Sequence, residues 1–121
     1  MPSTNDLRFL GAILAMSGIM LGAFGAHALK GTLAPPLQEV WHTAVEYQLW
    51  NAMGLIGLAG WEPVFQRPGR LIALGVLIFS GSLYTLALSN LHWLGAVTPL
   101  GGLCLLGGWG WVALKTWCHR K

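Results

Sequence analysis

A histidine and a carboxylate four residues apart have the clearest capacity for chemistry in this chain. His42 and Glu46 stand at positions i and i+4 of the segment 36–60, which starts with polar residues and is apolar from Ala52. On an α-helix this spacing stacks the two side chains, so that they can hydrogen-bond or exchange a proton. A carboxylate inside an apolar helix is costly and is a functional candidate by default. A structural bridge and a functional pair are equally good interpretations of this pattern.

Further polar side chains occur at comparable depth in the other apolar segments. The full set of candidates for a polar pocket is His27, His42, Glu46, Asn51, Tyr84 and Thr98. If the termini share one side of a membrane, these residues lie toward the opposite side, except Asn51, which lies near mid-membrane, and the remaining halves are nearly all Gly, Ala, Leu, Ile and Met. This pattern favours a pocket closed on the side of the termini over a through-pore. A lone Tyr84 or Asn51 is also the kind of residue that holds helices together by a hydrogen bond.

Other site chemistries have little support in the sequence. His27, His42 and Glu46 are metal-ligating types, but they come from two segments without a tight ligand spacing, so we expect no metal. The chain has no nucleophile elbow, phosphate loop or Cys–His pair, and we expect no cofactor. The net charge of +3 comes from basic residues set singly or in short groups between apolar runs. That placement is typical of topology signals and lipid contacts, so we expect no nucleic-acid partner.

The elements that must position these residues are apolar helices. Hydrophobic residues make up 55% of the 121 residues and charged residues only 9%, where a soluble domain carries about 25% charge. Four stretches approach the roughly 20 residues that cross a bilayer; they are 9–29, 36–60, 71–88 and 94–114. The sequence therefore predicts an all-α fold, an integral membrane four-helix bundle that forms a single transmembrane domain over 1–121.

The basic residues predict the orientation of this bundle. With four spans, the termini and the middle loop share a side, and that side holds Arg8, Arg67, Arg70, Lys115, Arg120 and Lys121. The other side holds Lys30 alone. By the positive-inside rule both termini are cytoplasmic. The first apolar run of 21 residues is longer than the roughly 7–15 of a signal peptide, so we expect an uncleaved span.

Small residues predict how the first helix packs. They recur at spacings of three and four along one stripe, at Gly11, Ala15, Gly18, Gly22 and Ala26. Such a stripe lets a neighbouring helix approach closely. The fourth segment is also rich in glycine, at 101, 102, 107, 108 and 110. Both patterns indicate close helix packing and need no further function.

Four motifs in order resemble a known family. They are GAFGAHALK (22–30), TAVEYQLWNA (43–52), FSGSLYTLALSN (79–90) and TPLGG (98–102), followed by Gly-Trp at 108–109. Together they are similar to the YgdD-like bacterial inner-membrane proteins, the group called domain of unknown function 423. This resemblance covers essentially the whole chain and implies a four-span protein of the bacterial cytoplasmic membrane. The family often has a histidine after the Tyr-Gln pair, where this chain has Asn51, so a proton relay through that position lacks its imidazole here.

Three functions remain open from the sequence. The leading expectation is a non-catalytic multi-pass membrane protein that binds a lipid, a small molecule or a partner through the polar pocket. The alternative is a small proton-linked transporter that uses Glu46 and His42 and acts as an oligomer. A membrane enzyme comes third. The expected partners are membrane lipids, together with a second copy of the chain or another membrane protein.

Overall fold

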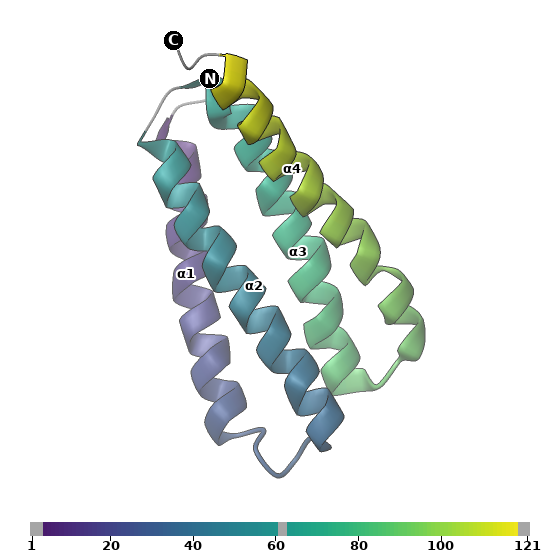
Figure 1. The fold of residues 1–121 in the computed structure, drawn as a ribbon. Coiled ribbons are helices and arrows are strands. Elements are labelled where there is room, and N and C mark those ends of the chain that lie inside the picture. Colours follow the sequence, from purple (N-terminus) through teal and green to yellow (C-terminus); the bar gives the residue numbers. More distant parts are fainter. Residues whose placement is uncertain (1–3, 61–62, 119–121) are drawn as a thin grey trace.

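Four α-helices make up most of the computed structural model, which describes residues 4–60 and 63–118 (Figure 1). They are α1 (Thr4–His27), α2 (Pro35–Ala59), α3 (Gln66–Ser89) and α4 (Thr98–Cys118). Two short 3-10 helices, η1 (Pro63–Phe65) and η2 (His92–Ala96), precede α3 and α4. The predicted all-helical fold with four long helices is confirmed.

The connections between helices use residues suited to turns. Gly31 follows α1 with a φ of 86°, a left-handed conformation that glycine adopts without steric cost. Pro35 and Pro36 then occupy the first two positions of α2, where no intrahelical partner for the backbone N–H is needed. Asn90 ends α3 with a φ of 58°, and asparagine is the residue after glycine that best tolerates this conformation.

The helices begin at other positions than the apolar pattern predicts, with α1 beginning at Thr4 rather than at 9 and α2 at Pro35 rather than at 36. α3 begins at Gln66 rather than at 71, because Pro68 falls in its first turn, where a proline does not interrupt a hydrogen bond. α4 begins at Thr98 rather than at 94, and Pro99 lies in its first turn for the same reason. The residues before it form η2.

The helices follow one another antiparallel, so that α1 begins and α4 ends at the same end of the bundle (Figure 1). We call this the terminal end and the other the opposite end. α2 packs between α1 and α3, and α4 packs along α3. The order across the molecule is therefore α1, α2, α3, α4, with a smaller contact between α1 and α3.

Glycines allow the closest helix approaches. The predicted stripe on α1 faces α2, where a Cβ on Gly18 would lie 2.7 Å from Leu49 and one on Gly22 would lie 3.2 Å from Val45. On α4, a Cβ on Gly108 would lie 2.5 Å from Ile72, and one on Gly101 would overlap the backbone of Phe79. The predicted close packing through small residues is confirmed at these contacts. Gly110 differs, since a Cβ there would meet open space.

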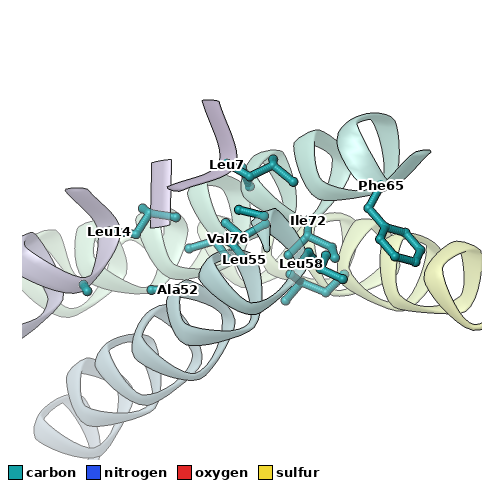
Figure 2. Close-up of a cluster of buried hydrophobic side chains, with 12 residues drawn as sticks. Leu7, Leu14, Ala52, Leu55, Leu58, Phe65, Ile72 and Val76 are labelled. Carbon is teal, nitrogen blue, oxygen red and sulfur yellow. The ribbon is translucent and has the colours of Figure 1, made fainter. Parts of the chain in front are cut away.

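Two apolar clusters fill the bundle. The larger lies in the half that includes the terminal end (Figure 2), and its buried members include Leu7, Leu14, Ala52, Leu55, Leu58, Phe65, Ile72, Val76 and Leu105. The smaller lies toward the opposite end and consists of Leu29, Trp41, Val45 and Ala87, with partly buried neighbours such as Tyr84. The half of the bundle toward the terminal end is thus closed by hydrocarbon packing.

Large apolar side chains also cover the outside. Phe9, Ile19, Leu77, Leu103 and Leu106 are each more than 60% exposed, and a water-soluble protein rarely exposes so much apolar surface. Three helical stretches of the described chain are long and apolar enough to cross a membrane. They are Asp6–His27, Gln66–Ser89 and His92–Cys118, the last including η2. α2 is more polar than these three, because its first half contains several charged and amide side chains.

Candidate functional site

A buried glutamine joins three helices at the level between the two apolar clusters. Gln48 of α2 is 4% exposed. Its Nε2 donates to Leu14 O at 2.9 Å and to Ser17 Oγ at 2.8 Å, both on α1. The Tyr84 hydroxyl of α3 donates to Gln48 Oε1 at 2.7 Å. The side chain is thus held from two sides, as a buried amide in an apolar setting requires.

Two further hydrogen bonds strengthen this junction. Ser80 Oγ of α3 donates to Ala44 O of α2 at 2.8 Å. Trp41 Nε1 of α2 donates to Leu21 O of α1 at 2.9 Å, and its ring meets that of Tyr84 edge-on with centroids 4.7 Å apart. Tyr84 therefore has a hydrogen-bond acceptor and an aromatic neighbour, and its place in the structure is explained by helix packing.

A second polar contact ties α4 to α2. Trp109 Nε1 donates to Asn51 Oδ1 at 2.7 Å, and Asn51 Nδ2 donates to Tyr47 O at 2.7 Å. The indole ring packs against Gly54, where an added Cβ would lie 2.6 Å from it. Asn51, expected from the sequence to act between helices or in a pocket, is the acceptor of an interhelical hydrogen bond.

Beside this contact lies an apolar groove of about 770 Å³ between α2 and α4. Its walls are Tyr47, Trp50, Asn51, Phe79, Pro99, Gly102, Leu103, Leu105, Leu106 and Trp109. Phe79 comes from α3, and the remaining residues come from α2 and α4. Leu103 and Leu106 are also among the most exposed apolar residues, so the groove opens onto the apolar outer surface of the bundle.

Most of this groove is not predictable from the sequence. Its walls are Leu, Gly, Pro and aromatic residues, which look like ordinary packing residues of apolar helices. A weak signal exists in Trp50 and Trp109, which stand away from the ends of their helices, whereas tryptophan in membrane proteins favours the interface.

The His42–Glu46 pair lies on the outside of the bundle. His42 Nε2 is 3.6 Å from a carboxylate oxygen of Glu46, and the two side chains are 73% and 42% exposed. The i and i+4 stacking predicted from the sequence is present. The pair does not contact the Gln48 junction, because Gln48 points from the opposite side of α2.

The last two candidates, His27 and Thr98, contact polar atoms of their own helix or of the adjacent helix. His27 is exposed at the end of α1, with Nδ1 2.8 Å from Ala23 O of the same helix. Thr98 at the start of α4 lies 2.6 Å from Ser82 Oγ of α3, and one hydroxyl donates to the other. The six candidates are therefore spread over the Gln48 junction, the groove, the α3–α4 contact and the exposed surface, and they do not gather around one centre.

His27, His42 and Glu46 are the residues of metal-ligating types among the six candidates. Across residues 4–60 and 63–118, no group of three or more His, Cys, Asp or Glu side chains is placed to hold a metal ion.

Antiparallel helices with an apolar outer surface and internal polar contacts define an integral membrane protein of the all-α class. The family profile described as "Protein of unknown function (DUF423)" matches residues 21–102. The chain belongs to this family of membrane proteins, as the motifs in its sequence suggested.

Individual relatives agree with that assignment. The chain is 43% identical to UPF0382 membrane protein SH2409 of Staphylococcus haemolyticus over 111 residues, which covers 88% of this chain and 91% of the relative. It is 41% identical to UPF0382 membrane protein YwdK of Bacillus subtilis, over 83% of this chain and 86% of the relative. It is 40% identical to UPF0382 inner membrane protein YgdD of Escherichia coli, over 84% of both chains. No solved structure matches the chain.

Proposed function

We propose that this protein crosses the cytoplasmic membrane four times, with both termini inside, and binds a hydrocarbon chain of a membrane lipid in the α2–α4 groove. The observation that carries the proposal is the groove itself. Its volume of about 770 Å³ falls within the roughly 300–1,000 Å³ of small-molecule sites. It opens on the surface that faces hydrocarbon in a bilayer.

The crossing of α2 is supported by its packing. The helix has 25 residues and is about 37 Å long, enough to cross a bilayer core of about 30 Å. It lies between α1 and α3, and its buried residues extend from Trp41 to Ala59. Gln48 and Asn51, two of the polar residues that lower its apolarity, have hydrogen-bond partners inside the bundle.

The chemistry of the groove favours an acyl chain over a polar ligand. The described residues that line it bear no carboxylate, imidazole or thiol, which are the usual acids, bases and nucleophiles. Asn51 already uses its amide oxygen for Trp109 and its amide nitrogen for Tyr47. The aromatic walls are held by packing, so an acyl chain enters a largely formed site.

The test is a pair of matched substitutions on α4. Gly102 lines the groove, and its added Cβ would lie 3.9 Å from Phe79, an ordinary van der Waals contact, so Gly102→Leu introduces a side chain at the wall of the groove. Gly110→Leu is the control, since a Cβ there meets open space outside the groove. Lipid retained after mild extraction is measured by native mass spectrometry. We expect Gly102→Leu to lose bound lipid several-fold and Gly110→Leu to retain it. Equal retention in both variants would contradict the proposal.

A proton-linked transporter is the second candidate, and the observation in its favour is the His42–Glu46 pair. A pair of this kind can bind and release protons at the membrane. Transport predicts proton flux in liposomes that Glu46→Gln abolishes, whereas lipid binding in the groove predicts no such flux.

A further inference from the structure

The outward face of α2 is unlike the outward faces of its neighbours. Glu39 and His42 are exposed and Glu46 is half-buried, and the stripe continues through Trp50 and Met53, which are 61% and 55% exposed. These residues follow one another at helical spacings of three and four, so they form one continuous face. We call it the His42–Glu46 face.

Apolar side chains occupy the outward faces of the other helices at similar depth. Ile19 of α1, Leu77 of α3 and Leu103 of α4 are each exposed by more than 60%. Such residues suit contact with lipid. If the outward face of α2 contacted lipid alone, we would expect apolar residues on it, as on the other three helices.

Depth makes the His42–Glu46 face costly. Glu46 is about three turns from the start of α2, or about 16 Å along the axis, which places it well below the headgroups if α2 crosses the membrane. Its carboxylate lies 3.6 Å from His42 Nε2, a contact longer than a good hydrogen bond. A partly exposed carboxylate at this depth needs a polar cover.

We propose that a second copy of this chain provides the cover, with α2 packed against α2 in a symmetric dimer. A two-fold interface uses the same patch on both copies, so the patch must complement itself. The His42–Glu46 face does so, because it presents a hydrogen-bond donor and an acceptor one turn apart. His42 of each copy then pairs diagonally with Glu46 of the other, across an offset of about 6 Å along the helix axes, and two pairs form at once.

The rest of the face fits the same arrangement. Two copies inserted in the same direction bring parallel α2 helices together at equal depth. Met53 and Trp50 then supply apolar contact on the side of Glu46 nearer the terminal end. Gly57 follows on the same face, and an added Cβ there would meet nothing within 4 Å, so the helices can approach closely at that level.

The His42–Glu46 face and the lipid groove share Trp50, which lies at the edge of both. The other α2 residues of the groove, Tyr47 and Asn51, line it toward α4, whereas His42, Glu46 and Met53 are not among its walls. The dimer rests on the proposed crossing of α2, but it does not need a lipid in the groove. Oligomeric state and bound lipid therefore report on separate proposals.

Cysteine cross-linking in native membranes tests the geometry. In a background in which Cys104→Ser and Cys118→Ser remove the free thiols, Met53→Cys places one thiol on the His42–Glu46 face. Met16→Cys is the control, because Met16 is 56% exposed, as Met53 is 55% exposed, but lies on α1. We expect mild oxidation to cross-link Met53→Cys into dimers and to leave Met16→Cys monomeric. No dimer from Met53→Cys, or equal amounts from both, would overturn the proposal.

A charge exchange tests the pairing itself. Counting labelled copies in liposomes gives the association constant, and wild-type protein should be mainly dimeric. His42→Glu places four carboxylates in the interface and should weaken association roughly tenfold or more. The double variant His42→Glu/Glu46→His restores a self-complementary face and should restore the dimer. A monomeric wild type, or a double variant as weak as the single one, would show that the two side chains serve something other than a second copy.

Discussion

Gln48 and Glu46 stand two positions apart on α2 and have opposite environments. Gln48 is buried and bonded to α1 and α3, whereas Glu46 faces outward. Among polar side chains in a membrane, the neutral amide is the cheaper to bury, because its donors and acceptor can all be satisfied without a charge. The internal role in this bundle accordingly belongs to the amide.

The first prediction concerns that amide. Gln48→Leu removes the hydrogen bonds to Ser17 and Leu14 and leaves the Tyr84 hydroxyl without its acceptor. We expect a loss of about 1–2 kcal/mol in the free energy of unfolding. The measurement is reversible unfolding in mixed detergent.

Two further variants make this result specific. Gln48→Leu with Tyr84→Phe should recover part of the loss, since both members of the hydrogen bond are then absent. Thr85→Ala is the control, because the exposed Thr85 hydroxyl bonds only within its own helix to Gly81 O. A Gln48→Leu protein as stable as Thr85→Ala would mean that the junction does not support the bundle.

At the level of the helices, α1 and α4 are attached in different ways. α1 contacts α2 along a stripe of small residues, through Gly18 and Gly22. α4 is pressed against α3 through Gly101 and Gly108 and reaches α2 through the side chain of Trp109. The Trp109 side chain spans a wider separation between α4 and α2 than the glycine contacts leave between α4 and α3. The groove lies in the space between α4 and α2.

The second prediction concerns the stripe on α1. Gly18→Leu with Gly22→Leu places branched side chains where Leu49 and Val45 already lie, which should separate α1 from α2 and cost about 1–3 kcal/mol of stability. Melting in detergent is the measurement. Ala12→Leu with Ala23→Leu is the matched control, since both alanines are exposed on the same helix. If the two double variants melt alike, the stripe does not pack against α2.

In the whole molecule, the start of α1 and the end of α4 lie at the same end of the bundle (Figure 1). This arrangement agrees with an even number of crossings. Among the described basic residues, Arg8, Arg67, Arg70 and Lys115 lie in the parts of α1, α3 and α4 nearest that end, and Lys30 lies in the α1–α2 connection at the other end. If α2 lay outside the membrane, three crossings would place the end of α4 on the opposite side from the start of α1.

The third prediction decides between these topologies. A fluorescent protein fused at Lys121 or inserted after Gly60 should fluoresce in the cytoplasm, and alkaline phosphatase inserted at Thr32 should be active outside. The reporters are read in intact cells, with each site tested with both reporters. An active phosphatase after Gly60 would indicate that α2 stays outside, and it would remove the depth argument for the His42–Glu46 face.

The sequence by itself was sufficient for the membrane class, the four helices and the family. Whether a segment prefers hydrocarbon depends on the composition of about 20 neighbouring residues, so it is a local property. Helix starts were less predictable, because a proline such as Pro68 is compatible with both a break and a first turn.

The tertiary structure decided which polar side chains meet. That outcome depends on the rotation of each helix about its axis, which is determined by close contacts such as Gly101 against Phe79 and Gly18 against Leu49. These contacts bury Gln48 and turn Glu46 outward, although both are polar and stand on one turn. They also place Trp109 over Gly54 and so create the groove. Such contacts join residues distant in sequence, and no local pattern specifies them.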